Sequence, residues 1–497
     1  MLKAMFGTKV DHPLADNNEV QRVLKDLPAQ EASAALDSAG AWFESLMMTA
    51  EFRPERRLDL IFQIDEAVMP HTRRLARDYL VAPRQTRAHE FRLWQANHGY
   101  WTRLVAAYED TLQRCHDDEK TAAAIKPQMA LLCARQFNAC SGRLKWQQFR
   151  YGPIDGNLWS RAGEAYLAAV RAQVADMKVS LYGSAGTTTP AAEYLRILIL
   201  SSSSPDNLLP VEIEIAERLI AHLLPNFSLT DLARPDNVYW VDAAKPLPPT
   251  RLARIPEITP TLRFYGTGSA LAALGKLRAA IEARGALPGE INFGGQYSPR
   301  LVLQVIDHLA VCWSPQPPMR HHERRAFKSR MTVVGRLDTI CLQLLGNADD
   351  GDRAESWVVE NVSQGGIGAQ VSLIGKDWLR VGSLVAMQPD GGNNWLVGIV
   401  RRFARESESI GVVGIETLSK TPSGHIADSQ GLPTPVILLD PPLDGGDVRV
   451  ALSVAAWEEQ KPLLVEVGSQ FWRLSPTTLL ETGAGHVIGG YRAKPAT

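Results

Sequence analysis

The 497-residue sequence predicts a multidomain α+β protein, with an all-α helical N-terminal region, an antiparallel β-barrel and a small C-terminal β module. Three observations predict this class. The chain is too long for one compact core. Apolar residues recur at helical spacing up to about residue 311 and follow the alternation of strands beyond about 357. Between these patterns lies the proline-rich segment 314–318, which cannot continue a helix.

We expect four domains along the chain. They are a helical domain at 1–150, a second helical region with an irregular, proline-rich segment at 151–313, the β-barrel at 319–420 and the β module at 434–493.

The first region reads as successive helices. Its clearest apolar seam has alternating spacings of three and four, which keep one face of a helix against a partner. The seam consists of Phe91, Trp94, His98, Trp101, Val105, Tyr108 and Leu112. Cys133 and Cys140 share a face of a later helix, and we expect them in the core, since free cysteine is among the most buried residue types.

The second region begins with a partial match to the first-helix pattern of a tetratricopeptide repeat, at Trp159, Gly163 and Tyr166. No second copy follows at a fixed period, so the pattern indicates a helix hairpin that can present a groove to a protein partner. Residues 236–260 are rich in proline and read as irregular, and amphipathic helices are expected near 269–283 and 298–311.

Beyond the linker, short alternating segments separated by Gly, Asp and Asn predict the strands of a barrel. The predicted strands are 357–360, 367–373, 383–388, 394–403 and 410–416. A polar linker at 421–433 is expected to lead to the β module. Its predicted strands are 436–439, 448–454, 463–467 and 471–474, with a turn at 444–446.

Composition narrows the class of function. The net charge of −1 predicts neither wrapping of DNA nor binding to an anionic membrane surface, and no segment has the length and apolarity to insert into a membrane. The N-terminus carries no signal-peptide pattern and the five cysteines are scattered, so we expect a cytoplasmic protein.

Two motifs near the start of the barrel carry the candidate chemistry. The segment 320–330 reads RHHERRAFKSR and holds one acid, Glu323. Alone it would be a solvated basic loop. About thirty-five residues on, Asn361 and Ser363 lie two apart at a predicted strand end, beside glycines that permit a tight turn.

Together these motifs resemble the PilZ family of bacterial cyclic di-GMP receptors, over residues 320–420. The Asn-x-Ser-x-x-Gly motif is complete in Asn361, Ser363 and Gly366. The arginine motif is shifted, because the second arginine of the family pattern falls on Ser329 and Arg330 comes one residue late.

The resemblance implies a PilZ-type β-barrel and a cytoplasmic effector that binds the nucleotide second messenger cyclic di-GMP and then changes its conformation or partner contacts. The outputs of such effectors include motility, pili and exopolysaccharide. It implies no catalysis and no metal or other cofactor. The ligand-binding residues that it implies are Arg320, Arg324, Arg325, Arg330, Asn361, Ser363 and Gly366.

Two alternatives stay open. The displaced Arg330 favours an adaptor whose degenerate barrel mediates protein contacts without binding nucleotide. An enzyme within residues 1–310 has no motif in its support. His321-His322-Glu323 is a poor metal site, because adjacent side chains of an extended segment point in opposite directions and no third ligand is near in sequence.

Overall fold

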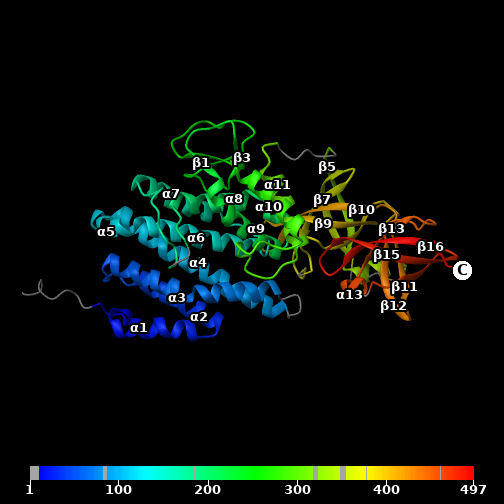
Figure 1. The fold of residues 1–497 in the computed structure, drawn as a ribbon, viewed down its shortest axis with the longest axis horizontal. Helices are drawn as coiled ribbons and strands as arrows, with labels where there is room; N and C mark the ends of the chain where they lie inside the picture. The colour runs from blue at the N-terminus through cyan, green and yellow to red at the C-terminus, as the bar shows by residue number, and fades with distance from the viewer. Residues whose placement is uncertain are drawn as a thin grey trace, which may run out of the picture. The chain divides into compact units, whose positions relative to one another are not determined.

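The structure, a computed structural model, describes residues 10–81, 87–183, 186–316, 323–346, 354–376, 378–458 and 460–496. It confirms the multidomain α+β class, with helices first and barrels after them (Figure 1). The chain divides into two compact units. The first comprises Met1–Arg150, Ile154–Pro205 and Pro210–Pro318, and the second comprises Tyr151–Pro153, Asp206–Leu209 and Met319–Thr497.

The first unit is mainly helical. Its α-helices are α1 (Asn17–Asp26), α2 (Ala32–Met48), α3 (Pro54–Val81), α4 (Arg87–Asp117), α5 (Glu119–Ile125), α6 (Met129–Gln148), α7 (Gly156–Arg171), α8 (Pro190–Ser202), α9 (Pro210–Leu223), α10 (Ala270–Arg284) and α11 (Pro299–Trp313). Helix α6 is buried on nearly all sides, because α4, α7, α8 and α9 pack around it. Its polar residues are therefore buried too, and buried polar groups need partners from neighbouring helices.

The predicted seam lies on α4. Trp101, Val105 and Tyr108 are buried as expected, whereas Phe91 is 46% exposed and packs against Trp94 near the start of the helix. The two cysteines predicted in the core, Cys133 and Cys140, are completely buried on α6. Burial raises the pKa of each thiol to about 12, so neither is reactive near neutral pH.

A four-stranded sheet in the first unit was not predicted. Two of its strands interrupt the segment 236–260, which is otherwise irregular as expected at 243–249 and 252–260. The strand order is β1-β4-β2-β3. The strands are β1 (Ser228–Thr230), β2 (Asn237–Asp242), β3 (Thr250–Arg251) and β4 (Leu262–Gly266). Nearly every residue of β2 and β4 is buried, so their sequences lack the alternation that identifies a strand with one exposed face.

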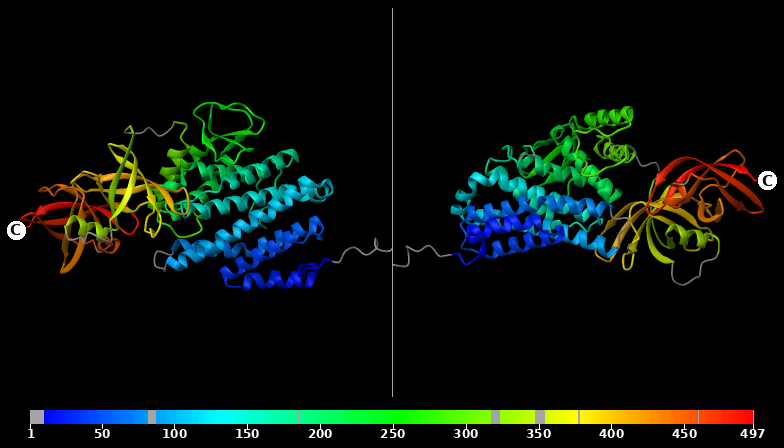
Figure 2. Two further views of the ribbon diagram at one scale, coloured as in Figure 1. Left: turned by 180° about the vertical axis from the view of Figure 1, so that it is seen from behind. Right: turned by 60° about the horizontal axis from the view of Figure 1, so that its bottom comes forward.

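The second unit begins with a closed barrel of strand order β10-β7-β6-β5-β8-β9 (Figure 2). The strands are β5 (Arg325–Gly335), β6 (Glu355–Ser363), β7 (Gly366–Ser372), β8 (Leu384–Pro389), β9 (Leu396–Arg405) and β10 (Ile410–Ser419), with helix α12 (Leu337–Leu344) after β5. Five of the six strands were predicted. Residues 325–330 of the segment read as a basic loop are instead the first half of β5, and they lacked a strand signal because almost all of them are exposed.

The C-terminal β module is itself a closed six-stranded barrel, of order β11-β12-β13-β16-β15-β14. Its strands are β11 (Ser423–Ser429), β12 (Leu432–Leu438), β13 (Asp447–Leu452), β14 (Leu463–Val467), β15 (Gln470–Thr482) and β16 (Val487–Pro495), and helix α13 (Val454–Glu458) follows β13. The predicted polar linker at 421–433 is wrong, because most of it forms β11 and the turn into β12. The turn expected at 444–446 is present, with Gly445 at φ 67°.

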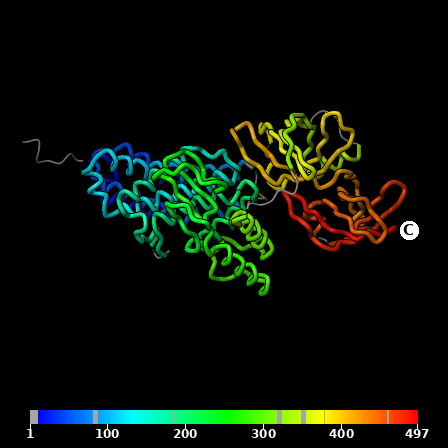
Figure 3. The backbone as a smooth tube through the Cα atoms, turned by 90° about the horizontal axis from the view of Figure 1, so that it is seen from above, coloured from blue at the N-terminus to red at the C-terminus, as the bar shows by residue number. Residues whose placement is uncertain are grey.

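The two barrels can be followed as separate parts of the chain in the tube view (Figure 3). Residues of both barrels form one apolar cluster. Val334 and Ile340 of the first barrel pack in this cluster with Ile437 and Ile488 of the second. Arg401 on β9 also forms ion pairs with Glu481 on β15. The tandem barrels therefore form one packed unit.

Within the described ranges, no helix combines the length and apolarity that crossing a bilayer requires. The same residues contain no group of three His, Cys, Asp or Glu side chains arranged to hold a metal ion.

Candidate functional site

Strand pairing brings the two sequence motifs together on the first barrel. In the antiparallel register of β5 and β6, Arg325 lies opposite Val362, and Ala326 lies opposite Asn361. Arg324 directly precedes this pair. The arginine-rich segment and the Asn-x-Ser segment, more than thirty residues apart in sequence, are thus neighbouring strand ends.

Asn361 lies on the outer face of the barrel. Side chains on a strand alternate between faces, and Ala369 and Val371 of β7 point into the barrel core. Asn361 lies opposite Gly368 in the β6–β7 register, so it faces outward with that residue. The partly exposed Asn361 amide is free to meet a molecule that approaches from solvent.

Glycines form the floor beside Asn361. Gly366 and Gly368 on β7 pair with Glu416 and Gly414 on β10, so three glycines occupy neighbouring outward positions. We call Gly366, Gly368 and Gly414 the glycine floor. The Asn361 amide lies over the buried Gly368, whereas Gly366 and Gly414 are partly exposed and carry no side chain.

The glycines differ in what a methyl group would meet. A Cβ on Gly366 would collide with the carbonyl oxygen of Ile415 on β10, so close strand packing requires glycine there. A Cβ on Gly368 would lie 2.6 Å from Nδ2 of Asn361, so this glycine leaves room for the Asn361 side chain. Gly366 thus allows β7 and β10 to pack closely, and Gly368 leaves space for the Asn361 side chain of the candidate site.

Ser363 ends β6 at a two-residue turn formed by Gln364 and Gly365. Its hydroxyl donates a hydrogen bond to the carbonyl oxygen of Gly366 at 3.2 Å. The Ser363 oxygen keeps its lone pairs available to accept from a ligand. The turn expected from the Asn-x-Ser-x-x-Gly motif is therefore present, with its serine already oriented.

The arginines predicted from the motif are only partly grouped. Arg324 and Arg325 are exposed at this strand end, and Arg325 lies opposite Val362, a residue of the core-facing side, rather than on the face of Asn361. Arg330 is also exposed but lies beyond an irregularity in the β5–β6 pairing, and its guanidinium donates to Ser356 Oγ at 3.1 Å. Arg320 lies outside the described residues.

Sequence reasoning missed Arg402 on β9. It lies opposite Gly414 and so borders the glycine floor on the side away from Asn361. Its Nε is 2.5 Å from Oδ2 of Asp206, a residue of the same compact unit. Only the predicted pairing of strands 394–403 and 410–416 could have placed this arginine, and its register could not be read from the sequence.

The exposed Glu360 lies at the irregularity of β6 beside Asn361, whereas the carboxylate opposite Gly366 is neutralised. Glu416, opposite Gly366, pairs with Nε of Arg401 at 2.6 Å. Burial lowers the pKa of Arg401, but its ion pairs with Glu481 and Glu416 outweigh this and raise it, so the guanidinium is always charged. The exposed guanidinium groups of Arg324 and Arg325 outnumber Glu360 at this strand end and suit an anionic ligand.

The fold and this face define a multidomain α+β protein whose first barrel carries a basic strand end beside an Asn-x-Ser-x-x-Gly hairpin. Residues 18–236 match the family model described as "Cyclic-di-GMP receptor FimW, N-terminal domain". The match covers most of the helical unit and neither barrel. The description names a receptor rather than an enzyme. No curated protein matches the chain.

Proposed function

We propose that the protein is a cyclic di-GMP receptor that binds its ligand on the outer face of the first barrel. The observation that carries the proposal is the β5–β6 register, which joins the arginine segment to Asn361 and Ser363. The family match of residues 18–236 supports the same ligand through a separate part of the chain.

The side chains suit the two chemistries of this ligand. Cyclic di-GMP carries two phosphodiester charges and two guanines. The guanidinium groups of Arg324 and Arg325 form paired hydrogen bonds to phosphate oxygens and can stack on a base. Asn361 and Ser363 provide a donor and acceptor for the edge of a guanine that lies on the glycine floor.

The signal, in this proposal, is a change at the basic half of β5. Arg325 and Ala326 pair with β6, but the pairing is interrupted before Ser329. A ligand held by both Arg324 and Ser363 fixes this strand end against the β6–β7 hairpin. Such fixing alters contacts with a protein partner, which we assign to the helical region.

Isothermal titration of the full chain with cyclic di-GMP tests the proposal. Saturable binding is expected, with at least a tenfold weaker Kd in the Arg324→Ala/Arg325→Ala variant, since a hydrogen bond to a charged group contributes about 1.5–3 kcal/mol. Ser363→Ala should weaken binding several-fold. Arg492→Ala, which removes an exposed arginine of β16, is the matched control and should bind normally.

The adaptor is the second candidate, and the position of Arg330 favours it. This arginine is engaged with Ser356 and stands apart from the Asn361–Ser363 pair. An adaptor predicts no heat and no thermal stabilisation at ligand concentrations well above micromolar. That result would refute the receptor and direct attention to protein partners.

A further inference from the structure

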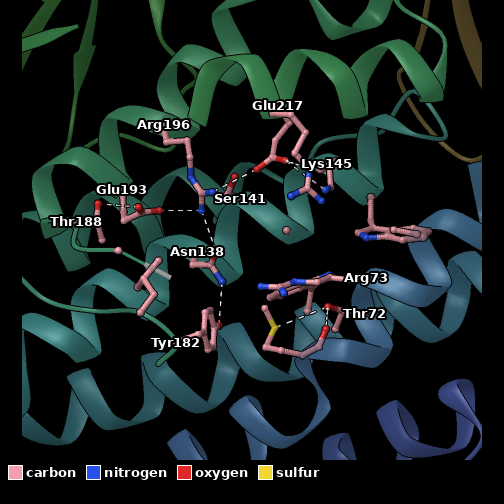
Figure 4. A pocket seen from close by; sticks show the side chains of 18 of the residues that line it. Thr72, Arg73, Asn138, Ser141, Lys145, Tyr182, Thr188, Glu193, Arg196 and Glu217 are labelled. Atoms are coloured by element: carbon pink, nitrogen blue, oxygen red, sulfur yellow. Dashed lines mark hydrogen bonds and ion pairs between the residues drawn. The ribbon is translucent and has the colours of Figure 1, made fainter. Parts of the chain in front are cut away.

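A polar cavity in the helical unit is independent of the barrel face. Its volume is about 340 Å³, and residues of α3, α4, α6, α8 and α9 line it together with the loop around Tyr182 (Figure 4). This volume is at the lower end of the range for small-molecule sites. It suits a ligand of mononucleotide size or less rather than a cyclic dinucleotide.

A buried hydrogen-bond network centred on Asp65 supports one wall of the cavity. Asp65 is completely buried and accepts hydrogen bonds from the hydroxyls of Tyr100 and Tyr108, both at 2.7 Å, and from Tyr182 at 3.0 Å. Burial raises the pKa of Asp65, while the buried Arg135 and the three hydroxyls oppose this and stabilise the carboxylate. The network fixes Tyr182 at the cavity edge.

A chain of hydrogen bonds continues from Tyr182 across the cavity. Asn138 donates to the Tyr182 hydroxyl at 3.0 Å and accepts from Arg196 at 2.8 Å. Arg196 also pairs with Glu193 at 2.8 Å and with Glu217 at 3.3 Å. Each side chain is thus oriented before any ligand arrives, which lowers the entropic cost of binding.

Lys145, Arg196 and Arg218 surround Glu217 on α9 and affect its ionisation. Burial alone would raise the pKa of Glu217, but Lys145, Arg196 and Arg218 lower it to about 2. Glu217 is therefore ionised at neutral pH. Its negative charge balances part of the positive charge of the surrounding Lys and Arg side chains.

Arg73, the indole N–H of Trp101 and Nε of Arg196 belong to residues that line the cavity, and these donors have no partner among the described residues. No carboxylate in the described chain pairs with Arg73, an exposed residue of α3. Trp101 is 6% exposed, and its indole N–H is buried without a hydrogen-bond acceptor. Figure 4 shows Arg73 and Arg196 approaching the same space from opposite sides, with Asn138 between them.

We infer that this cavity binds a small phosphate monoester. Arg73, Trp101, Arg196 and Lys145 line the cavity from different helices, and the first two carry donors without a partner among the described residues. A tetrahedral phosphate with three terminal oxygens can accept from all of them, whereas a planar carboxylate offers fewer directions. An N–H that is buried without an acceptor is costly to the free protein, and a phosphate oxygen satisfies it.

The test is calorimetric titration of the full chain with inorganic phosphate and with guanosine monophosphate. We expect saturable binding of the monophosphate at one site, with phosphate competing for it. Arg73→Gln should weaken binding about tenfold or more and Trp101→Phe several-fold. Arg74→Gln, which changes the next residue of α3 and disturbs only an exposed pair with Asp78, should bind as the parent does.

The proposal does not depend on the barrel site, so the Arg324→Ala/Arg325→Ala variant should bind the monophosphate normally. Thermal unfolding of each variant shows whether it is folded. The inference is overturned if neither anion binds saturably, if folded Arg73→Gln and Trp101→Phe bind as well as the parent, or if the barrel variant alone abolishes monophosphate binding.

Discussion

The glycine floor makes a specific prediction for Gly368→Ala. The added methyl group would lie 2.6 Å from Nδ2 and 2.7 Å from Oδ1 of Asn361. Contacts this short force the amide to move. Because the obstructing atoms belong to a partly exposed side chain rather than to backbone, the barrel should keep its stability while Asn361 loses its orientation.

The magnitude follows from the bonds that Asn361 makes in our proposal. One or two neutral hydrogen bonds to guanine contribute about 1–2 kcal/mol, which corresponds to a roughly 5- to 30-fold weaker Kd. Asn361→Ala should lose about the same. If Gly368→Ala acts only through Asn361, the double variant should bind no more weakly than Asn361→Ala alone.

Isothermal titration with cyclic di-GMP measures all three variants, and thermal unfolding checks that each is folded. Gly366→Ala provides the contrast, because its methyl group meets the backbone of Ile415 and should destabilise the barrel by about 1–3 kcal/mol. Unchanged affinity in Gly368→Ala, or losses that add fully in the double variant, would refute the role of the floor.

Three further predictions concern the helical unit. Asp65→Asn removes the buried carboxylate partner of Arg135 and leaves it only the half-exposed Glu66, so it should destabilise the unit by about 3–5 kcal/mol. Denaturant unfolding within about 1 kcal/mol of the parent would contradict the network. Burial lowers the pKa of His98 to about 4, so the unfolded chain binds a proton between pH 6.5 and 4 that the folded chain does not. As the pH is lowered through that window, the free energy of unfolding should decrease by up to about 1.4 kcal/mol per pH unit. The same pH dependence in His98→Gln would disprove the assignment. Gly163→Ala places a methyl group of α7 against the carbonyl oxygen of Ala243 and should lower the free energy of unfolding by about 1–3 kcal/mol in the same assay. A value equal to that of the parent would show that the loop around Ala243 moves to make room.

The fold was predictable where one face of an element is buried and the other is exposed. The α4 seam around Trp101 and the strands near Asn361 followed from periodicity alone. Strands β2 and β4 were missed because both faces are buried, and the first half of β5 was missed because it is exposed on both faces. In each case the alternation that identifies a strand is absent.

The candidate site was predictable only in part, for a related reason. Local spacing identified Asn361, Ser363 and Gly366, since a hairpin motif is contained in a few residues. The placement of Arg402 beside Gly414, and of Arg330 beyond the irregularity in β5, depends on strand register between distant segments. The cavity around Arg73 was not predictable, because five helices and a loop supply its lining.

Hydrogen–deuterium exchange of the full chain, with and without cyclic di-GMP, locates the ligand and so distinguishes the barrel face from the helical unit. We expect the strongest protection in peptides that cover residues 323–330 and the hairpin 361–366, with smaller effects elsewhere. Protection confined to the helices around the Arg73 cavity, with the barrel peptides unchanged, would contradict the assignment of the ligand to the barrel face.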